Sequence, residues 1–210
     1  MPVDITYRQK PLYQRELYTK GGITRLYWDY RDKIALSFLE KNDQSIIDIG
    51  CGEGITLDKI RALFPGRRII GLDGIIENLF ICKKYNNQVI GGDAFQLPFK
   101  SNIFDCAIFL EVIEHLSDPG TAILEIRRIL KPGAKLIIVF PNDFTFKMAR
   151  ILTLKFKEAA FDAGHLMQWS PKNMRSFLNR HGFEVLKQVN IPFYLWHFSL
   201  HHLVICRKEG

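Results

Sequence analysis

The sequence predicts an α/β fold: a doubly wound, mostly parallel sheet with an antiparallel carboxy-terminal hairpin. Short apolar runs rich in β-branched residues recur between residues 45 and 140, and segments with helical spacing separate them. This alternation of strand and helix is typical of a parallel sheet covered on both faces. Right-handed crossovers then give the doubly wound order. Two further strand-like runs follow residue 180 and complete a set of seven.

The five buried strands of the central part are expected at 45–49, 68–72, 88–91, 105–110 and 134–140. Helices are expected between them, and turn residues mark where two of the three stop. Pro65-Gly66 follows the helix expected at 55–64, and Lys131-Pro132-Gly133 follows the one at 121–130. The third helix is expected at 76–85.

After residue 140 the pattern changes. A basic stretch of aliphatic and aromatic residues at 143–160 predicts an inserted helix. Ser170-Pro171 predicts the start of another helix through Arg180, because serine accepts hydrogen bonds from free amides and proline suits the first helical position. Gly182 closes that helix. Strands expected at 183–190 and 200–207 would pair as an antiparallel hairpin at one sheet edge.

The 210 residues are enough for one domain. We expect a helical lid at 1–44, a cofactor-binding core at 45–140, a basic helical insertion at 141–170, and a helix with the hairpin at 171–210.

No apolar run reaches membrane-spanning length and no signal-peptide core begins the chain, so we expect a cytoplasmic protein with no transmembrane segment. The four separated cysteines predict buried thiols, with neither a disulfide framework nor a thiolate zinc site.

The formal net charge of +7 is unevenly distributed. Residues 46–115 carry 7 basic and 9 acidic side chains, whereas residues 116–210 carry 14 basic and 7 acidic ones. A basic surface can face an anionic partner such as RNA or a phosphorylated metabolite, and it is also common on solvated helices. The excess therefore leaves an anionic partner open.

A glycine loop follows the first strand, in the stretch Asp48-Ile49-Gly50-Cys51-Gly52-Glu53-Gly54. Alternate glycines allow a sharp turn and let a ligand lie against the backbone. The spacing is Gly-x-Gly-x-Gly, which differs from the dinucleotide fingerprint and disfavours a nicotinamide dehydrogenase. Glu53 within the turn suits a cationic ligand better than a phosphate.

Acidic residues end the next two strands. Asp73 comes 19 residues after Gly54, where a carboxylate can accept both hydroxyls of a ribose, and Asp93 could receive an exocyclic amine. Each alone could be a turn or cap residue. Together with the glycine loop, their order and spacing fit one nucleoside ligand bound at the carboxyl ends of the strands.

These motifs, with Phe104-Asp105-Cys106-Ala107 and Leu130-Lys131-Pro132-Gly133, resemble class I S-adenosylmethionine-dependent methyltransferases of the type 11 and ubiquinone-pathway O-methyltransferase kind. The resemblance implies the seven-stranded, Rossmann-like methyltransferase fold and S-adenosylmethionine as cofactor. It implies that the glycine loop holds the methionine part, Asp73 the ribose, and Asp93 with Ala94 the adenine edge. The full set of cofactor contacts implied is Asp48, Gly50, Cys51, Gly52, Asp73, Gly74, Asp93, Ala94 and Leu110.

The fourth strand runs into Leu110-Glu111-Val112-Ile113-Glu114-His115. If a helical turn starts here, Glu111, Glu114 and His115 share one face. Such a group can hold a metal, act as a general base with orienting partners, or cap the next turn. These three residues are the candidate catalytic set.

The same segment resembles small-RNA 2′-O-methyltransferases of the Hen type as well as ubiquinone-pathway enzymes. In the RNA enzymes the two glutamates and the histidine join a later histidine around a divalent ion, and His165 is the counterpart here. Glu111, Glu114, His115 and His165 are therefore a candidate metal site. A metal-free His115 base and a structural role stay open beside it.

Other residues carry less specific signals. Related enzymes bring an arginine preceding the first strand to the cofactor carboxylate, but we expect Arg25 and Arg31 to be exposed helix residues. His201 and His202 would point to opposite faces of a strand, so we expect no shared metal there. The aromatic connection at 193–198 is expected to pack the hairpin, and an apolar acceptor pocket or a membrane contact is its alternative.

The sequence thus predicts methyl transfer from S-adenosylmethionine to oxygen or nitrogen of a small-molecule acceptor, anionic or apolar in character. The alternatives are an RNA ribose 2′-O-methyltransferase with a divalent metal ion, with nucleic acid the less favoured partner, and a cofactor-binding protein without catalysis. The identity of the acceptor and the oligomeric state do not follow from the residues.

Overall fold

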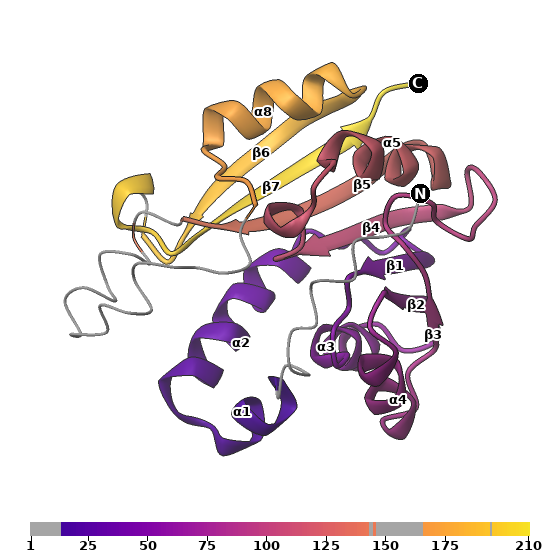
Figure 1. Cartoon of the computed structure of the whole chain (residues 1–210), viewed down its shortest axis with the longest axis vertical. Coiled ribbons are helices and arrows are strands. Elements are labelled where there is room, and N and C mark those ends of the chain that lie inside the picture. The colour runs from indigo at the N-terminus through magenta and orange to yellow at the C-terminus, as the bar shows by residue number, and fades with distance from the viewer. Residues whose placement is uncertain (1–13, 143–144, 146–165, 194) are drawn as a thin grey trace.

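The computed structural model describes residues 14–142, 145, 166–193 and 195–210, and it contains the predicted sheet (Figure 1). Seven strands lie in the order β3-β2-β1-β4-β5-β7-β6. Their bounds are β1 Ser45–Ile49, β2 Arg68–Asp73, β3 Val89–Gly91, β4 Phe104–Leu110, β5 Leu130–Pro141, β6 Phe183–Ile191 and β7 His201–Lys208. The doubly wound, mostly parallel fold class is confirmed.

Strands β1 to β5 pair in parallel, and the order reverses between β1 and β4. All five residues of β1 are buried, because neighbouring strands flank it on both sides and helices cover both faces. The carboxyl ends of β1 and β4 diverge at this reversal, which is where open α/β sheets bind ligands. The glycine loop and the Glu111 segment therefore both start at this crevice.

The two last strands pair with each other in antiparallel register, as expected. β7 also pairs antiparallel with β5, so β7 lies inside the sheet and, of these two strands, only β6 is an edge strand. This position buries both faces of β7, including His201 and His202. The two histidines indeed face opposite sides of the sheet: His201 contacts Tyr27, and His202 contacts Phe140.

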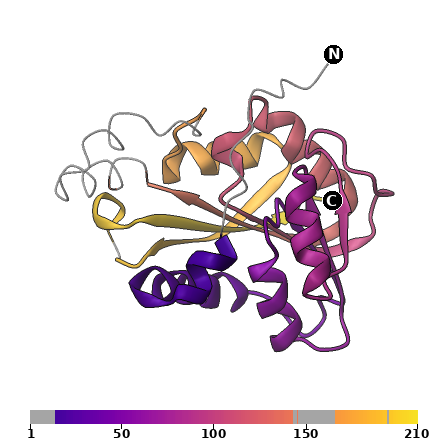
Figure 2. The same cartoon turned by 60° about the horizontal axis from the view of Figure 1, so that its bottom comes forward.

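Helices cover the two faces of the sheet (Figure 2). Their bounds are α1 Gln14–Lys20, α2 Gly22–Leu36, α3 Ile55–Leu63, α4 Ile76–Lys84, α5 Pro119–Ile129 and α8 Pro171–Arg180, with short 3-10 turns η1 Ile113–His115 and η2 Trp196–Phe198. Apolar residues of α5 and α8 pack on one face, and those of α2 and α3 pack on the other. Helix α4 joins α3 through Cys82 and Leu57.

The caps explain where two helices begin. The Ser170 side chain accepts a hydrogen bond from the amide of Asn173, as predicted. Helix α5 starts at Pro119, two residues before the expected Thr121, because Asp118 caps it and proline fits the first turn. Strand β5 starts at Leu130, which we expected to end that helix.

Helices α1 and α2 fall within the predicted lid. The basic helix expected at 143–160, and with it most of the insertion expected at 141–170, lies outside the described residues. No helix in the described part of the chain is both long enough and apolar enough to cross a membrane.

Candidate functional site

Two cavities meet at the glycine loop. Gly50 borders both, and its φ of +73° places it in the left-handed region. A side chain at this position would also overlap Val112, which lies over the loop from the β4 side. Only glycine fits both requirements, so the turn after β1 stays open for a ligand that passes from one cavity to the other.

The first cavity, here called the polar cavity, has a volume of about 160 Å³ and lies between α2, the glycine loop and the end of β4. Asp48 lines it, and its Oδ2 atom is buried without a hydrogen-bond partner. Burial, followed by the negative charge of Asp32, raises the pKa of the Asp48 carboxyl well above its ordinary value. The predicted contacts that line the polar cavity are Asp48, Gly50, Cys51 and Leu110.

Arg31, on α2, also lines the polar cavity and is largely buried, with 12% of its side chain exposed. Its Nε and Nη2 atoms lie 2.9 and 2.8 Å from Oδ1 of Asp32, and Nη1 lies 3.4 Å from Oε1 of Glu111. Burial lowers the pKa of the guanidinium, but the negative charges of Asp32 and then Glu111 raise it by more than burial lowers it. Arg31 therefore keeps its positive charge. The expectation of an exposed Arg31 is wrong, because α2 packs this face onto the sheet. Arg25 is about half exposed.

Asp73 joins β2 to the glycine loop. Its Oδ2 accepts a hydrogen bond from the amide of Gly52 at 2.7 Å, and its Oδ1 accepts from the amide of Ile75 at 2.8 Å and from Asn78 at 3.1 Å. The carboxylate is held in one orientation at the carboxyl end of β2. It therefore fixes the loop in addition to any ligand contact.

The second cavity, here called the apolar cavity, has a volume of about 600 Å³. Asp93 lies at its edge, with Oδ1 accepting a hydrogen bond from the amide of Phe95 at 2.9 Å. The rest of the lining is mostly apolar or glycine. The predicted contacts in it are Gly50, Gly74, Asp93 and Ala94, and the remainder of the lining is Ile49, Leu72, Ile76, Leu79, Gly91, Gly92, Phe95, Val112 and Leu116.

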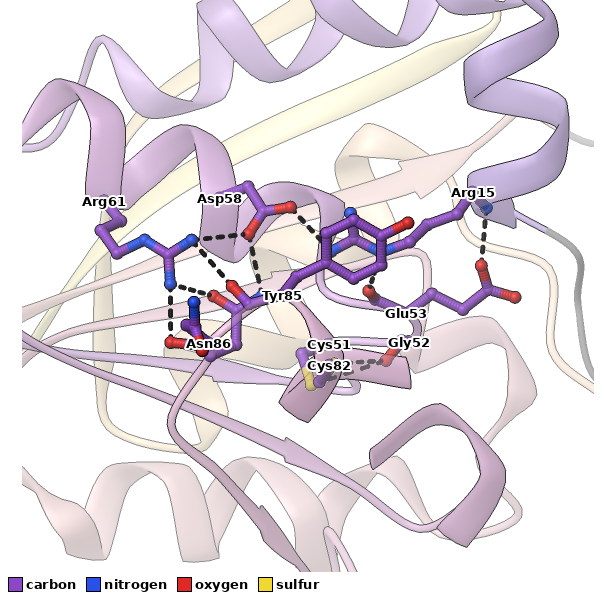
Figure 3. A network of polar contacts seen from close by, with 10 residues as sticks. Arg15, Cys51, Gly52, Glu53, Asp58, Arg61, Cys82, Tyr85 and Asn86 are labelled. Carbon is purple, nitrogen blue, oxygen red and sulfur yellow. Dashed lines mark hydrogen bonds and ion pairs between the residues drawn. The ribbon is translucent and has the colours of Figure 1, made fainter. Parts of the chain in front are cut away.

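The Glu53 carboxylate points to the start of α1 (Figure 3). It accepts hydrogen bonds from the amides of Gln14 and Arg15 at 3.1 and 2.6 Å, and so caps α1. Arg15 in turn donates to the Glu53 carbonyl at 2.6 Å, pairs with Asp58 at 2.7 Å, and stacks on Tyr85. This set of contacts fastens the lid to the glycine loop.

The cysteines are free and buried, as predicted. Cys51 and Cys82 both lie at the Gly52 carbonyl, with sulfur-to-oxygen distances of 3.8 and 3.3 Å (Figure 3). They fill the space beneath the loop, where α3 and α4 approach each other.

The segment after β4 does not form the helical turn expected from Glu111. Glu111 has a φ of +57°, and the 3-10 turn η1 begins only at Ile113. Glu111 therefore points to α2 and β7, while Glu114 is buried with Oε1 3.9 Å from Nε2 of His115. The Glu114 carbonyl accepts hydrogen bonds from the amides of Leu166 and Met167 at 2.8 and 3.2 Å.

The described residues contain no group of three or more His, Cys, Asp or Glu side chains placed to hold a metal ion. His165, the fourth predicted ligand, lies outside them. The metal site expected from Glu111, Glu114, His115 and His165 thus gains no support from the part of the chain that the structure describes.

A third cavity of about 530 Å³ contains two residues that sequence reasoning missed, Tyr27 and His201. The Tyr27 hydroxyl lies 2.5 Å from Nδ1 of His201, and Nε2 of His201 lies 2.6 Å from Oε1 of Glu111. Alternation along the strand correctly placed His201 and His202 on opposite faces, but the sequence offers no signal for the pairing of His201 with an α2 tyrosine. The lining of this third cavity is Ile23, Thr24, Tyr27, Trp28, Glu111, Leu200 and His201.

Comparison with known proteins gives a consistent match. A family model described as "Methyltransferase domain" matches residues 23–188. A probable S-adenosylmethionine-dependent methyltransferase of Mycolicibacterium smegmatis is 27% identical over 163 residues, covering 76% of this chain and 60% of the relative. A ubiquinone biosynthesis O-methyltransferase of Cereibacter sphaeroides is 28% identical over 171 residues, covering 78% of this chain and 64% of the relative. The chain spans less than two thirds of the length of these relatives.

A third relative, from Arabidopsis thaliana, is a tRNA (carboxymethyluridine(34)-5-O)-methyltransferase that is 35% identical over 107 residues, covering 49% of this chain and 26% of the relative. Among solved structures, a Haloferax volcanii putative methyltransferase, in complex with the Trm112 activator, superposes with a TM-score of 0.71 at 20% identity, covering 94% and 96% of the two chains. The [4+2]-cyclase SpnF superposes with a TM-score of 0.68 at 18% identity, covering 86% and 80%. These two likenesses concern the fold.

Proposed function

Because the chain belongs to the methyltransferase-domain family, we propose that it is an S-adenosylmethionine-dependent methyltransferase that acts on an oxygen or nitrogen atom of a small molecule. The acidic stretch from 46 to 115 supports a cationic cofactor, since the ligand of this fold carries a sulfonium.

The observation that carries the proposal is that the polar cavity holds both a buried carboxyl oxygen without a hydrogen-bond partner, on Asp48, and the guanidinium of Arg31. The methionine end of the cofactor is an amino acid with an ammonium and a carboxylate. The unpartnered Oδ2 of Asp48 fits the ammonium, because a buried acceptor without a donor costs stability until a ligand supplies one. Arg31 in the same cavity fits the carboxylate.

The adenosine end fits the apolar cavity in size and chemistry. Asp93 and the backbone at Ala94 supply polar groups at the edge of an otherwise apolar lining, as the flat adenine ring requires. Asp73 ends β2, the strand next to β1, and is the candidate for the ribose hydroxyls. Gly50 borders both cavities, so one extended ligand can occupy both.

Bound S-adenosylmethionine supplies a methyl group on a positively charged sulfur. The task of the chain is then to hold the acceptor atom in line with the methyl carbon and the sulfur, since orientation supplies much of the rate of such displacements. The glycine loop and Asp73 fix one end of that line. Glu111 and Leu110, at the carboxyl end of β4, line the polar cavity, and in this proposal the acceptor approaches from their side.

Calorimetric titration with S-adenosylmethionine and S-adenosylhomocysteine tests the proposal. We expect both to bind, and Asp73→Asn and Asp48→Asn to weaken binding about tenfold or more, because each removes a charge-assisted hydrogen bond. Glu184→Gln, an exposed carboxylate on β6, is the matched control and should bind like the wild type. Absence of binding to the wild-type chain would refute the proposal.

RNA methylation is the second candidate. The 35% identical tRNA methyltransferase and the 14 basic against 7 acidic residues of 116–210 favour it. An RNA acceptor predicts an affinity for unmodified tRNA that falls steeply with salt, because phosphate contacts release counterions. A small-molecule enzyme would bind tRNA weakly at physiological salt and show no preference among sequences.

A further inference from the structure

We propose that the third cavity, between α2 and β7, is the acceptor site, that it takes a small, predominantly apolar amine, and that Glu111 contacts the amine nitrogen. The inference rests on the proposed function and names the acceptor class for it. We refer to this space below as the acceptor cavity.

Its position is the first argument. Trp28 and Glu111 line both the acceptor cavity and the polar cavity, so the two spaces meet at these side chains. An acceptor held in this cavity can therefore reach the polar cavity past Trp28 and Glu111. A molecule bound between α2 and β7 would present its reactive atom to Glu111.

The lining is the second argument. Ile23, Tyr27, Trp28 and Leu200 provide apolar and aromatic surface, whereas charge enters through Glu111. Such a lining selects a molecule that is apolar over most of its surface and carries one polar group. Aromatic rings also favour a cationic group near them, and Tyr27 and Trp28 both line the cavity.

The fixed charge of Glu111 is the third argument. Its side chain is 34% exposed, and Oε1 lies 2.6 Å from Nε2 of His201 and 3.4 Å from Nη1 of Arg31. Burial favours the neutral carboxyl, but His201, and after it Arg31, outweigh burial and hold the pKa of Glu111 at about 2. The Glu111 side chain is thus ionised at neutral pH, and Arg31 balances part of the negative charge that it brings to the acceptor cavity.

Tyr27 and His201 act as positioning residues. Nδ1 of His201 lies 2.5 Å from the Tyr27 hydroxyl, and the other ring nitrogen is at Glu111, so both nitrogens are engaged within the protein. Burial, and then the charge of Glu111, raise the pKa of the Tyr27 hydroxyl, which keeps the phenol protonated. The chain from Tyr27 through His201 orients the Glu111 carboxylate.

Methyl transfer to an amine nitrogen needs no proton acceptor during the transfer itself. The lone pair of the neutral nitrogen forms the new bond to the methyl carbon, the carbon–sulfur bond breaks, and its electron pair stays on sulfur. The positive charge moves from sulfur to nitrogen, and the product leaves as an ammonium ion with all its protons. An ionised carboxylate beside the nitrogen stabilises that developing charge.

A hydroxyl acceptor fits less well. Its oxygen must lose a proton during the transfer, which calls for a base that titrates near neutral pH. Glu111 is too weak a base for that task, and both nitrogens of His201 already have partners. The geometry therefore favours nitrogen over oxygen.

The test compares two probes of the same shape, 2-phenylethylamine and 2-phenylethanol, by calorimetry with saturating S-adenosylhomocysteine. At neutral pH the free amine is protonated and so resembles the ammonium product, and the comparison reports on the charge that the cavity offers. The form that accepts the methyl group is the neutral amine, which arises by loss of that proton to solvent before the transfer. We expect the wild-type chain to bind the amine at least tenfold more tightly than the alcohol. Glu111→Gln should abolish this preference, and the exposed control Glu184→Gln should keep it.

The role of His201 is tested with a pair of variants. His201→Gln can place an amide nitrogen where Nε2 lies, and should retain part of the amine preference. His201→Phe has a similar shape without a nitrogen, and should lose the preference while thermal unfolding shows that it is folded. Equal loss in both variants would contradict the positioning role.

Two results separate this inference from the proposed function. If S-adenosylhomocysteine binds and the wild-type chain shows no amine preference, or Glu111→Gln retains it, the inference is overturned and the proposed function stands. If S-adenosylhomocysteine does not bind but the amine preference and its loss in Glu111→Gln are found without it, the proposed function fails and the cavity keeps its assignment as an amine site.

Discussion

Asp48 has one buried carboxylate oxygen without a partner, and Asp48→Asn is expected to stabilise the free chain at neutral pH while weakening cofactor binding. Burial and the neighbouring negative charges, Asp32 first, raise the pKa of Asp48 in the folded state. The folded chain then binds more protons than the unfolded chain above the ordinary value of 3.8. Stability must therefore fall as pH rises through the window that starts there.

The size of the effect follows from the single group involved. A single group that is protonated in the folded chain and ionised in the unfolded chain lowers the free energy of unfolding by about 1.4 kcal/mol per pH unit within the window. Asparagine has the same shape without the ionisation, so the slope due to this residue should vanish. Because the pKa of Glu111 is lowered from 4.5 to about 2, the stability that it contributes changes only below about pH 5, and it is common to both proteins.

The assay is urea unfolding of wild type and Asp48→Asn between pH 5 and 8, read as the difference in the free energy of unfolding. We expect the difference to grow in favour of the variant as pH rises. S-adenosylmethionine binding to the wild type should strengthen with pH, because its ammonium favours ionised Asp48. Parallel stability curves over the whole range would refute the reasoning about Asp48.

Three further outcomes are expected. Glu53→Gln removes the charge that caps α1, and should speed hydrogen exchange at the amides of Gln14 and Arg15, with Glu184→Gln unchanged. Gly50→Ala forces a side chain against Val112 at positive φ, and should lower both stability and S-adenosylhomocysteine affinity, read by thermal unfolding and calorimetry. Ser170→Ala should cost about 1 kcal/mol in urea unfolding, since the amide of Asn173 loses its acceptor; an unchanged midpoint would contradict the capping role.

Much of the fold was predictable because local signals decided it. β1 has the expected bounds, and α3 ends one residue before the expected position, because the apolar run of β1 and the Pro65-Gly66 break are local. The start of α5 was misplaced although Asp118 and Pro119 carried the signal for it. The prediction for Glu111 failed for another reason: its positive φ depends on how the chain leaves β4.

The acceptor side of the site was not predictable. His201 lies 90 residues after Glu111 in the chain, and Tyr27 lies on a helix before the first strand. They meet because β7 inserts between β5 and β6 and α2 packs across that part of the sheet. The role of Glu53 as the cap of α1 likewise depends on where α1 packs, which the glycine loop's own residues do not indicate.

The sequence by itself determined the parallel sheet, the glycine loop and the acids that end its strands, because strand burial and turn chemistry depend on neighbouring residues. Only the tertiary structure decided which charges share a cavity. Packing places Arg31 and Asp48 in the lining of one cavity, and it brings the Glu53 carboxylate to the start of α1. It also brings Glu111 within 2.6 Å of His201. The physical reason is that electrostatic pairing depends on distance in space, and distance between segments far apart in the chain is set by packing.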